Sequence, residues 1–321
     1  MMKNISDFPF LYEFQRQGVQ ELLNGKQLLA DGTGMGKSVE ILSYCECMPY
    51  TKILLIVPNP LKINWLNELE KFFGIKGIVL EGKLEERKQI FDDFIKSDNK
   101  YLISNYEQLN PRNAFLQTFF WHCLIFDEAH RVKNYRTKTY RFGKKIQASH
   151  RIGLTATPLT NHALEIFSIV NFLKPNFFNW YTFRTTYGVF GQVFKGPKLG
   201  YQTDIVDWKN LDDLNKILNT LMIKREKKDV LPQLPSKIYK TYYVELSDEE
   251  QRIHDHYFQL MKDAFDKKDD QMFSYLSLMQ QISGGTRLLS LTDSENKIES
   301  KEDENSKLDV LKDILNSIGF E

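Results

Sequence analysis

Short runs of consecutive apolar residues recur along the first half of the chain. The run at residues 53–57 reads Ile-Leu-Leu-Ile-Val, and a run without polar alternation is typical of a strand buried on both faces of a parallel sheet. Between the runs, apolar residues recur at helical spacing, as they do from residue 8 to residue 24. This alternation predicts a doubly wound parallel sheet of the α/β class. We expect its strands at residues 27–30, 52–57, 77–80, 101–104, 123–126 and 151–155.

The pattern changes after about residue 160, where helical periodicity dominates and predicts a mainly helical subdomain. Residues 188–203 are the exception, because glycines among aromatic residues there predict a hairpin or a projecting loop. Residues 238–246 alternate as a strand does. Ser247 followed by Glu250 predicts a capping box that opens a helix.

The last part of the chain differs again in composition. Residues 293–306 are acidic and polar, as linkers are, and an amphipathic pattern restarts at residue 308. We therefore predict three parts, which are a sheet domain at 1–175, a helical part with a hairpin-like loop and a return strand at 176–290, and a linker with the start of another unit at 291–321.

Charge and cysteine content narrow the class of protein. The net charge of +1 argues against a globally basic coat for nucleic acid, so a site of that kind must be a local patch. The N-terminus lacks an apolar signal core, and no apolar run approaches membrane-spanning length. An odd number of cysteines without zinc-type spacing fits free thiols in a reducing compartment. We expect a cytoplasmic protein whose Cys45, Cys47 and Cys123 are unpaired.

The strongest chemical motif lies between the first predicted strand and a helix that starts near Ser38. Its closely spaced glycines let the backbone turn tightly and point successive N–H groups inward. Lys37 adds a positive charge and Ser38 a hydroxyl at a helix N-terminus, where the dipole already favours an anion. The stretch predicts a phosphate-binding loop, with Lys37 for the β- and γ-phosphates and Ser38 for Mg²⁺. The other candidate cofactor-binding residues of this loop are Asp31, Gly32, Thr33, Gly34, Met35 and Gly36.

A second motif follows the fifth predicted strand, which ends in two adjacent carboxylates. Beside a phosphate loop, the first carboxylate completes the Mg²⁺ shell and the second orients or deprotonates the attacking water. We therefore assign Asp127 to the metal and Glu128 to the water, although the pair taken alone could be an ordinary helix cap. His130 is a candidate link between nucleotide and substrate, with a core or capping histidine as the alternative. Thr155 and Thr157 could relay the state of the γ-phosphate. The alternative is that they only form an ordinary transition from a strand to a turn.

Basic residues follow the carboxylate pair. Residues 131–151 contain eight Lys or Arg and no Asp or Glu, and aromatic residues interleave with them. Beside a phosphate site, such a run could track the backbone of a nucleic acid. A solvated helix face is the alternative. Residues 224–228 form a second basic cluster, for which the solvated face is the stronger interpretation.

In their order along the chain, these motifs resemble those of the Swi/Snf-type ATPases, the DNA-translocating branch of helicase superfamily two. The loop at residues 30–38 looks like that family's first motif, which explains Asp31 where the general phosphate-loop pattern has glycine. Gly32 and Thr33 depart from the family's usual Glu and Met. The most specific match is Asp127-Glu128-Ala129-His130 followed by residues 131–134. Further matches lie at residues 11–19, 58–68, 104–107, 154–161, 172–175, 224–230, 234–237 and 246–257.

The resemblance implies a RecA-like lobe that binds ATP and Mg²⁺ and acts on double-stranded DNA. It implies that Gln15 reads the adenine. Because members of the family translocate on DNA, it also refines the expected location to nucleoid-associated in a prokaryote or virus and nuclear in a eukaryote. The DNA contacts that it implies are Asn64, Trp65, Tyr106, Arg131, Lys133 and Asn134.

The same family order leads us to expect a second lobe. The family has two RecA-like lobes with ATP between them, and the second brings arginines that complete the site. Such arginines contribute roughly 10³–10⁵-fold in rate. We expect the second lobe C-terminal to Glu321, and little or no hydrolysis by residues 1–321 alone.

Three functions stay open at this point. The leading one is an ATP-driven translocase on double-stranded DNA. A strand-separating helicase on DNA or RNA is the first alternative, because the Asp-Glu-Ala-His form also occurs there, but Asn134 and Asn161 favour the translocase. A nucleotide-gated binding module without productive hydrolysis is the second, and an intact Glu128 speaks against it.

Overall fold

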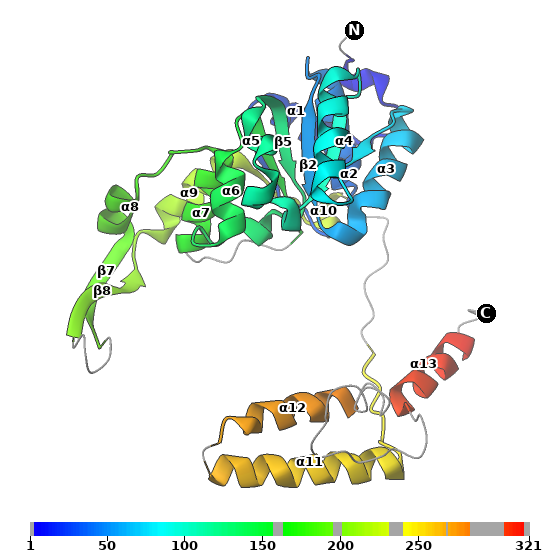
Figure 1. Ribbon diagram of the computed structural model, residues 1–321, viewed down its shortest axis with the longest axis vertical. Coiled ribbons are helices and arrows are strands. Elements are labelled where there is room, and N and C mark those ends of the chain that lie inside the picture. Colours follow the sequence, from blue (N-terminus) through cyan, green and yellow to red (C-terminus); the bar gives the residue numbers. More distant parts are fainter. Residues whose placement is uncertain are drawn as a thin grey trace. The chain divides into compact units, whose positions relative to one another are not determined.

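A seven-stranded parallel sheet organises the N-terminal part of the chain (Figure 1). The computed structural model describes residues 3–156, 163–194, 201–230, 240–267, 269–282 and 305–317. Within these residues the strand order is β3-β4-β2-β5-β6-β1-β9. The bounds are Leu28–Leu29 for β1, Ile53–Val57 for β2, Ile78–Val79 for β3, Tyr101–Asn105 for β4, Trp121–Phe126 for β5, Ala148–Leu154 for β6 and Met222–Ile223 for β9.

Helices cover both faces of this sheet, which confirms the predicted doubly wound α/β fold. The side chains of β2 alternate between the two faces of the sheet. Ile53, Leu55 and Val57 belong to one apolar cluster, and Leu54 and Ile56 belong to the other. The first cluster includes side chains of α1 (Glu13–Leu23), α2 (Lys37–Cys47) and α3 (Lys62–Glu68). The second includes side chains of α4 (Leu84–Lys96), α5 (Phe115–Thr118), α6 (Lys138–Lys145), α7 (Ala163–Leu173) and α9 (Leu211–Leu221).

Short helical turns connect several of these elements. Most are 3-10 helices, and all but the first, which precedes α1, follow a strand or lie between a strand and a helix. Their bounds are Ile5–Asp7, Asn59–Leu61, Tyr106–Gln108, Pro111–Asn113 and Ala129–Val132, and a π-helical turn spans Leu69–Phe73 directly after α3.

One predicted strand is wrong and one observed strand was not predicted. Residues 240–246 form no strand, although 238–246 alternate in sequence, and residues 238 and 239 lie outside the described part of the chain. Tyr242 and Tyr243 are exposed there, so the alternation has no sheet face to bury. Met222–Ile223 instead pairs with β1 at the edge of the sheet. A strand of two residues is too short to produce a periodic signal.

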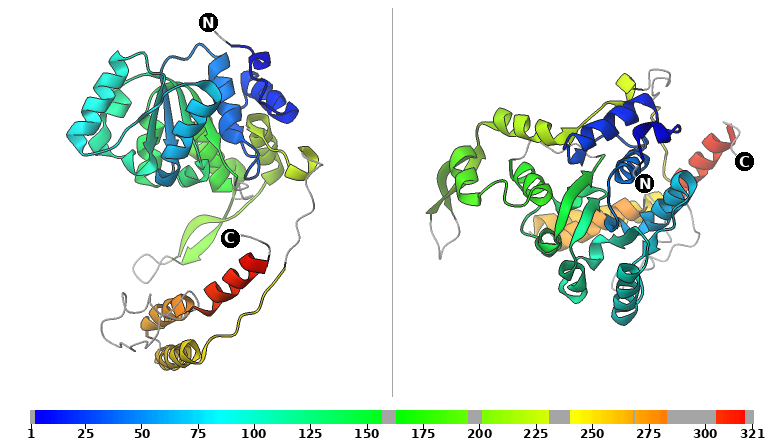
Figure 2. Two further views of the ribbon diagram at one scale, coloured as in Figure 1. Left: turned by 90° about the vertical axis from the view of Figure 1, so that its right-hand side faces the viewer. Right: turned by 90° about the horizontal axis from the view of Figure 1, so that it is seen from above.

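The predicted hairpin is confirmed. α8 (Trp180–Tyr187) leads into β7 (Gly188–Phe194), which pairs antiparallel with β8 (Tyr201–Trp208). The hairpin projects away from the large sheet in all the views of Figures 1 and 2. The rings of Phe183 and Trp208 hold its base, with centroids 5.7 Å apart.

The chain divides into two compact units, Met1–Pro235 and Ser236–Glu321. The second unit contains α11 (Asp248–Asp266), α12 (Gln271–Ile282) and α13 (Ser306–Ser317). The predicted capping box is present, because Ser247 Oγ accepts from the Glu250 N–H and Glu250 Oε2 accepts from the Ser247 N–H. The domain boundaries that we predict at 175 and 290 stay predictions.

Two further expectations concern the whole chain. All three cysteines are free, as predicted, and Cys45 and Cys123 are buried. Among the residues that the structure describes, none of the helices combines the length and the apolar character that a membrane span needs.

Candidate functional site

The chemistry-bearing motifs follow neighbouring strands. β1 pairs with β6 and β6 pairs with β5, all in parallel, so the segments that leave these strands meet at one edge of the sheet. The Asp127 N–H donates to the Ile56 carbonyl over 2.9 Å, and the Thr155 N–H donates to the Leu29 carbonyl over 3.0 Å. Both residues therefore still belong to the hydrogen-bonded ladder, and the sheet itself holds them in place.

The glycine-rich loop after β1 has the backbone geometry of an anion-binding concavity. Gly34 and Gly36 have φ values of 72° and 76°, which are left-handed, and α2 begins at Lys37. The Lys37 amine donates to the carbonyls of Asp31 and Gly32 over 2.9 and 3.0 Å. Burial lowers the pKa of Lys37, while the nearby carboxylates of Glu128 and Asp127 oppose that shift. The loop therefore places one cation and a series of N–H groups at a helix N-terminus.

Three hydrogen bonds hold Asp127, the first residue of the acidic pair. Asp127 Oδ2 accepts from Trp65 Nε1 over 3.0 Å, and Oδ1 accepts from the Glu128 N–H over 2.9 Å. The Tyr106 hydroxyl donates to the Asp127 carbonyl over 2.6 Å. Burial raises the pKa of Asp127 despite the bond from Trp65. Glu128 itself has a left-handed φ of 52°, so the backbone bends sharply between the two carboxylates.

Two of the predicted DNA contacts, Trp65 and Tyr106, are therefore found beside Asp127. The side chains of Trp65 and Tyr106 are 3% and 4% exposed, and each bonds to Asp127. Their contacts make both side chains supports of the acidic pair, and their contact with DNA stays a prediction. The sequence pattern could not reveal this, because the residues are far from Asp127 along the chain.

Glu68 belongs to the stretch 58–68 that matches the family, and α3 places it beside Ser38 and Asp127. Burial raises the pKa of the Glu68 carboxyl, while the nearby Ser38 hydroxyl opposes that shift. Its Oε2 atom is buried and has no hydrogen-bond partner in the described part of the chain. A buried acceptor without a partner beside Ser38 and Asp127 is an oxygen-rich environment of the kind that Mg²⁺ and its waters prefer.

The residues present fit a magnesium ion that is shared with phosphate. No group of three His, Cys, Asp or Glu side chains among the described residues could form a metal cage by itself. Mg²⁺ is usually bound by one or two protein ligands, waters and substrate phosphates. Ser38 and Asp127 offer a hydroxyl and a carboxylate for that purpose.

His130 lies between the acidic pair and the end of β6. Its Nδ1 is 3.2 Å from Glu128 Oε2 and 3.5 Å from Thr155 Oγ1. His130 thus connects the second motif to the third, and its role as a link between nucleotide and substrate stays a prediction. Thr157, the other residue of the predicted relay, lies outside the described residues.

Gln15, the predicted adenine reader, lies against the phosphate loop. Its Nε2 donates to the Met35 carbonyl over 3.0 Å, and its Oε1 accepts from the Tyr12 N–H over 2.9 Å. A Cβ atom on Gly36 would collide with the Gln15 side chain. α1 and the loop are therefore joined by a close contact that only glycine at position 36 permits.

A buried ionic cluster underlies the loop, and sequence reasoning missed it. Asp31 and Glu40 have fully buried side chains, and both pair with Arg225 from the segment after β9. Arg225 also donates to the Phe14 carbonyl beside Gln15. The carboxylate of Asp31, a predicted cofactor-binding residue, is thus occupied by Arg225. The basic cluster at residues 224–228 was the available signal, and a solvated face was the wrong interpretation for Arg225.

The other predicted DNA contacts are exposed. Arg131 lies 3.6 Å from a carboxylate oxygen of Glu107, and its guanidinium lies over the Tyr106 ring. The Lys133 amine pairs with Glu165 over 2.9 Å. Asn64 and Asn134 also lie on the surface.

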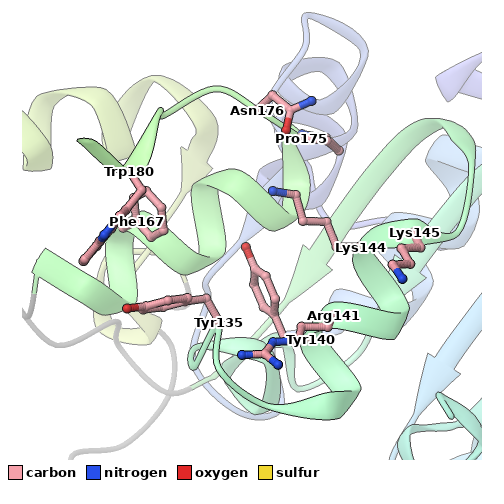
Figure 3. A pocket seen from close by; sticks show the side chains of 9 residues that line it. All are labelled: Tyr135, Tyr140, Arg141, Lys144, Lys145, Phe167, Pro175, Asn176 and Trp180. Carbon is pink, nitrogen blue, oxygen red and sulfur yellow. The ribbon is translucent and has the colours of Figure 1, made fainter. Parts of the chain in front are cut away.

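The cations of the basic run at 131–151 do not all lie on the surface. Arg151 is buried and donates to backbone carbonyls, including those of Lys144 and Phe172. Three other cations line a cavity of about 540 Å³ between α6, α7 and the start of α8 (Figure 3). The residues that line this cavity include no carboxylate and are Tyr135, Tyr140, Arg141, Lys144, Lys145, Phe167, Pro175, Asn176 and Trp180.

A parallel sheet with a glycine-rich loop after one strand and a carboxylate pair after a near neighbour defines a RecA-like lobe of the phosphate-loop class. The family model described as SNF2-related domain matches residues 14–304. The chain therefore belongs to the SNF2-related domain family. This confirms the Swi/Snf-type resemblance that the motifs indicate.

Individual relatives agree with this assignment. An uncharacterized ATP-dependent helicase of Mycoplasma genitalium is 28% identical over 76% of this chain and 23% of its own length. The chromatin structure-remodeling complex subunit snf21 of Schizosaccharomyces pombe is 30% identical over 78% of this chain and 22% of its own length. The chain thus spans less than a quarter of the length of these relatives.

A solved structure shares the fold. The SWI2/SNF2 ATPase core of Sulfolobus solfataricus, solved in complex with double-stranded DNA, matches with a TM-score of 0.56 and 24% identity. The match covers 95% of this chain and 64% of that one.

Proposed function

We propose that this chain is the first RecA-like lobe of an ATP-dependent motor that translocates on double-stranded DNA. The observation that carries the proposal is the convergence of Lys37, Asp127 and Glu128 at the carboxyl ends of β1 and β5, which β6 alone separates. Membership of the SNF2-related domain family supports the same activity.

Each residue of the site has a chemical task in this proposal. Lys37 would turn from the loop carbonyls to the β- and γ-phosphates of ATP, and the loop N–H groups would bind the same oxygens. Ser38 and Asp127 would hold Mg²⁺, which supplies charge neutralisation on the phosphates. Glu128 would orient and deprotonate the attacking water, and His130 would connect it to Thr155. Trp65 and Tyr106 would keep Asp127 in position.

Two observations support DNA as the track. The solved structure that shares this fold contains double-stranded DNA. In this chain, Arg131, Lys133 and Asn134 follow the acidic pair directly and are exposed. Cations at that place could bind phosphates of a strand without reading its bases.

Nucleotide binding by residues 1–321 is the direct test. We expect calorimetry to detect Mg²⁺-ATP, and Lys37→Ala to weaken binding by about tenfold or more, because charge-assisted hydrogen bonds to the phosphates are lost. Glu128→Gln should still bind. Lys88→Ala, on the exposed face of α4, is the matched control and should bind as the parent does. Equal affinities of the Lys37→Ala and Lys88→Ala variants would refute the nucleotide site.

Turnover and translocation require the natural full-length protein. There, Glu128→Gln should abolish hydrolysis that duplex DNA stimulates. The unaltered protein should displace a third strand from a triplex but leave a plain duplex paired. Efficient separation of a plain duplex would favour a strand-separating helicase, and unchanged biological activity of Glu128→Gln would favour a nucleotide-gated binding module.

A further inference from the structure

The segment that follows β9 is clamped to the root of the phosphate loop. The Arg225 N–H donates to Asp31 Oδ1 over 2.7 Å, and Arg225 Nε donates to Asp31 Oδ2 over 2.8 Å. The same guanidinium donates to both carboxylate oxygens of Glu40, over 2.9 and 2.8 Å. Because Asp31 immediately precedes Gly32, this clamp fixes the position of residue 225 relative to the loop.

Two residues further on, Lys227 reaches the tip of the loop. A Cβ atom on Gly34 would stand 3.5 Å from the Lys227 Nζ. Gly34 has a left-handed φ, and its missing side chain leaves the space that the ammonium group approaches. The segment after β9 therefore brings a positive charge to the turn whose N–H groups face an anion.

The charge of Lys227 is available for a ligand. Lys227 is exposed and forms no ion pair with any other residue that the structure describes. Its neighbour Lys228 differs, because the Lys228 amine pairs with Glu226 over 2.8 Å. Arg225 is also committed, to Asp31 and Glu40.

We propose that Lys227 is a second cation of the nucleotide site and contacts the terminal phosphates of a bound nucleoside triphosphate. The inference rests on the proposed function, since it concerns the same loop. Lys37 and Mg²⁺ together do not balance all the negative charges of a triphosphate, so a further cation at the loop stabilises the bound state. A lysine is a point charge on a flexible stem, so Lys227 can follow the phosphates through small movements of the loop. The attraction increases with the number of phosphates and decreases as salt screens it.

The test compares neighbouring lysines in equilibrium binding rather than in turnover. The affinities of Mg²⁺-ATP, Mg²⁺-ADP and AMP are measured by calorimetry for Lys227→Ala, Lys228→Ala and the parent chain. We expect Lys227→Ala to weaken ATP binding about three- to tenfold, ADP binding less and AMP binding not at all. Lys228→Ala should match the parent, Lys227→Arg should restore most of the affinity, and the loss should shrink at high salt.

Several outcomes would overturn this inference. Equal affinities for Lys227→Ala and Lys228→Ala would show that the ammonium of Lys227 does not reach the phosphates. An equal loss for ATP, ADP and AMP would show that the effect does not follow the phosphate chain. If Lys37→Ala loses ATP binding while Lys227→Ala does not, the proposed function stands and this inference falls. If the parent binds no nucleotide, both fall.

Discussion

At the scale of single residues, two carboxyl groups share one guanidinium beneath the phosphate loop. The side chains of Asp31 and Glu40 are both 0% exposed, and that of Arg225 is 15% exposed. Two carboxylates against one cation would leave an uncompensated buried negative charge, which is costly in a medium of low dielectric constant. Burial raises the pKa of Glu40 to about 8, although Arg225 opposes the shift. The carboxyl group of Glu40 therefore keeps its proton at neutral pH and adds no negative charge to the cluster.

This arrangement makes stability depend on pH in a defined window. The pKa of Glu40 is near the ordinary value of 4.5 in the unfolded chain but about 8 in the folded chain. Its contribution is therefore complete below about pH 4.5 and is lost as pH rises toward about 8, at up to about 1.4 kcal/mol per pH unit. We expect urea denaturation between pH 5 and pH 8 to give a flatter profile for Glu40→Gln than for the parent. Glu85→Gln, which alters an exposed carboxylate on α4, is the control. Parallel profiles for the parent and Glu40→Gln would contradict this assignment.

At the scale of elements, α3 supports the acidic pair because of where its strand lies. β2 pairs with both β4 and β5, so the chain that leaves β2 emerges beside the end of β5. α3 begins five residues after β2 ends and brings Trp65 and Glu68 to Asp127 and Ser38. A helix that carries two of the DNA contacts expected from the sequence thus also contributes side chains to the candidate site.

Trp65→Phe tests this support. The change keeps an aromatic ring in the buried position but removes the N–H that donates to Asp127 over 3.0 Å. We expect the free energy of unfolding to fall by about 1–3 kcal/mol, as for a hydrogen bond to a charged group, and the pKa of Asp127 to rise further. Chemical denaturation at pH 7 measures the first effect. Trp180→Phe, at a partly exposed tryptophan on α8, should change stability much less, and similar losses for both variants would exclude a special role for Trp65.

At the scale of the whole molecule, the proposed nucleotide site lies entirely in the first compact unit. Both large apolar clusters also belong to that unit, whereas Ile253, Tyr257, Leu278 and Ile282 form a small cluster in the second. The match to the SNF2-related domain family continues to residue 304 and so crosses the boundary after Pro235. The family match therefore includes residues of both compact units.

A truncation tests the independence of the first unit. We expect residues 1–235 to fold by themselves, because that segment retains the sheet, both large clusters and the Arg225 clamp. Circular dichroism should show a cooperative thermal transition, and affinity for Mg²⁺-ATP should stay within about twofold of that of the 321-residue chain. A fragment that is unfolded, or that binds ATP far more weakly, would show that residues 236–321 complete the lobe.

Local patterns in the amino-acid sequence were sufficient to predict much of this structure. The apolar run of β2, the glycines before Lys37 and the capping box at Ser247 each express short-range chemistry, and each predicted its local structure correctly. These features depend on neighbours within a few residues, which a linear pattern records.

Contacts between residues that are distant in the sequence determined the other features of the site. Asp31 is clamped by Arg225 because β9 pairs with β1, and Trp65 reaches Asp127 because β2 pairs with β5. These partners are separated by scores of residues, so no periodicity links them. Residues 240–246 show the converse, since their alternation formed no strand without a neighbouring strand to bond. Backbone hydrogen bonds and burial depend on which segments become neighbours in space, and that information exists only once the chain is folded.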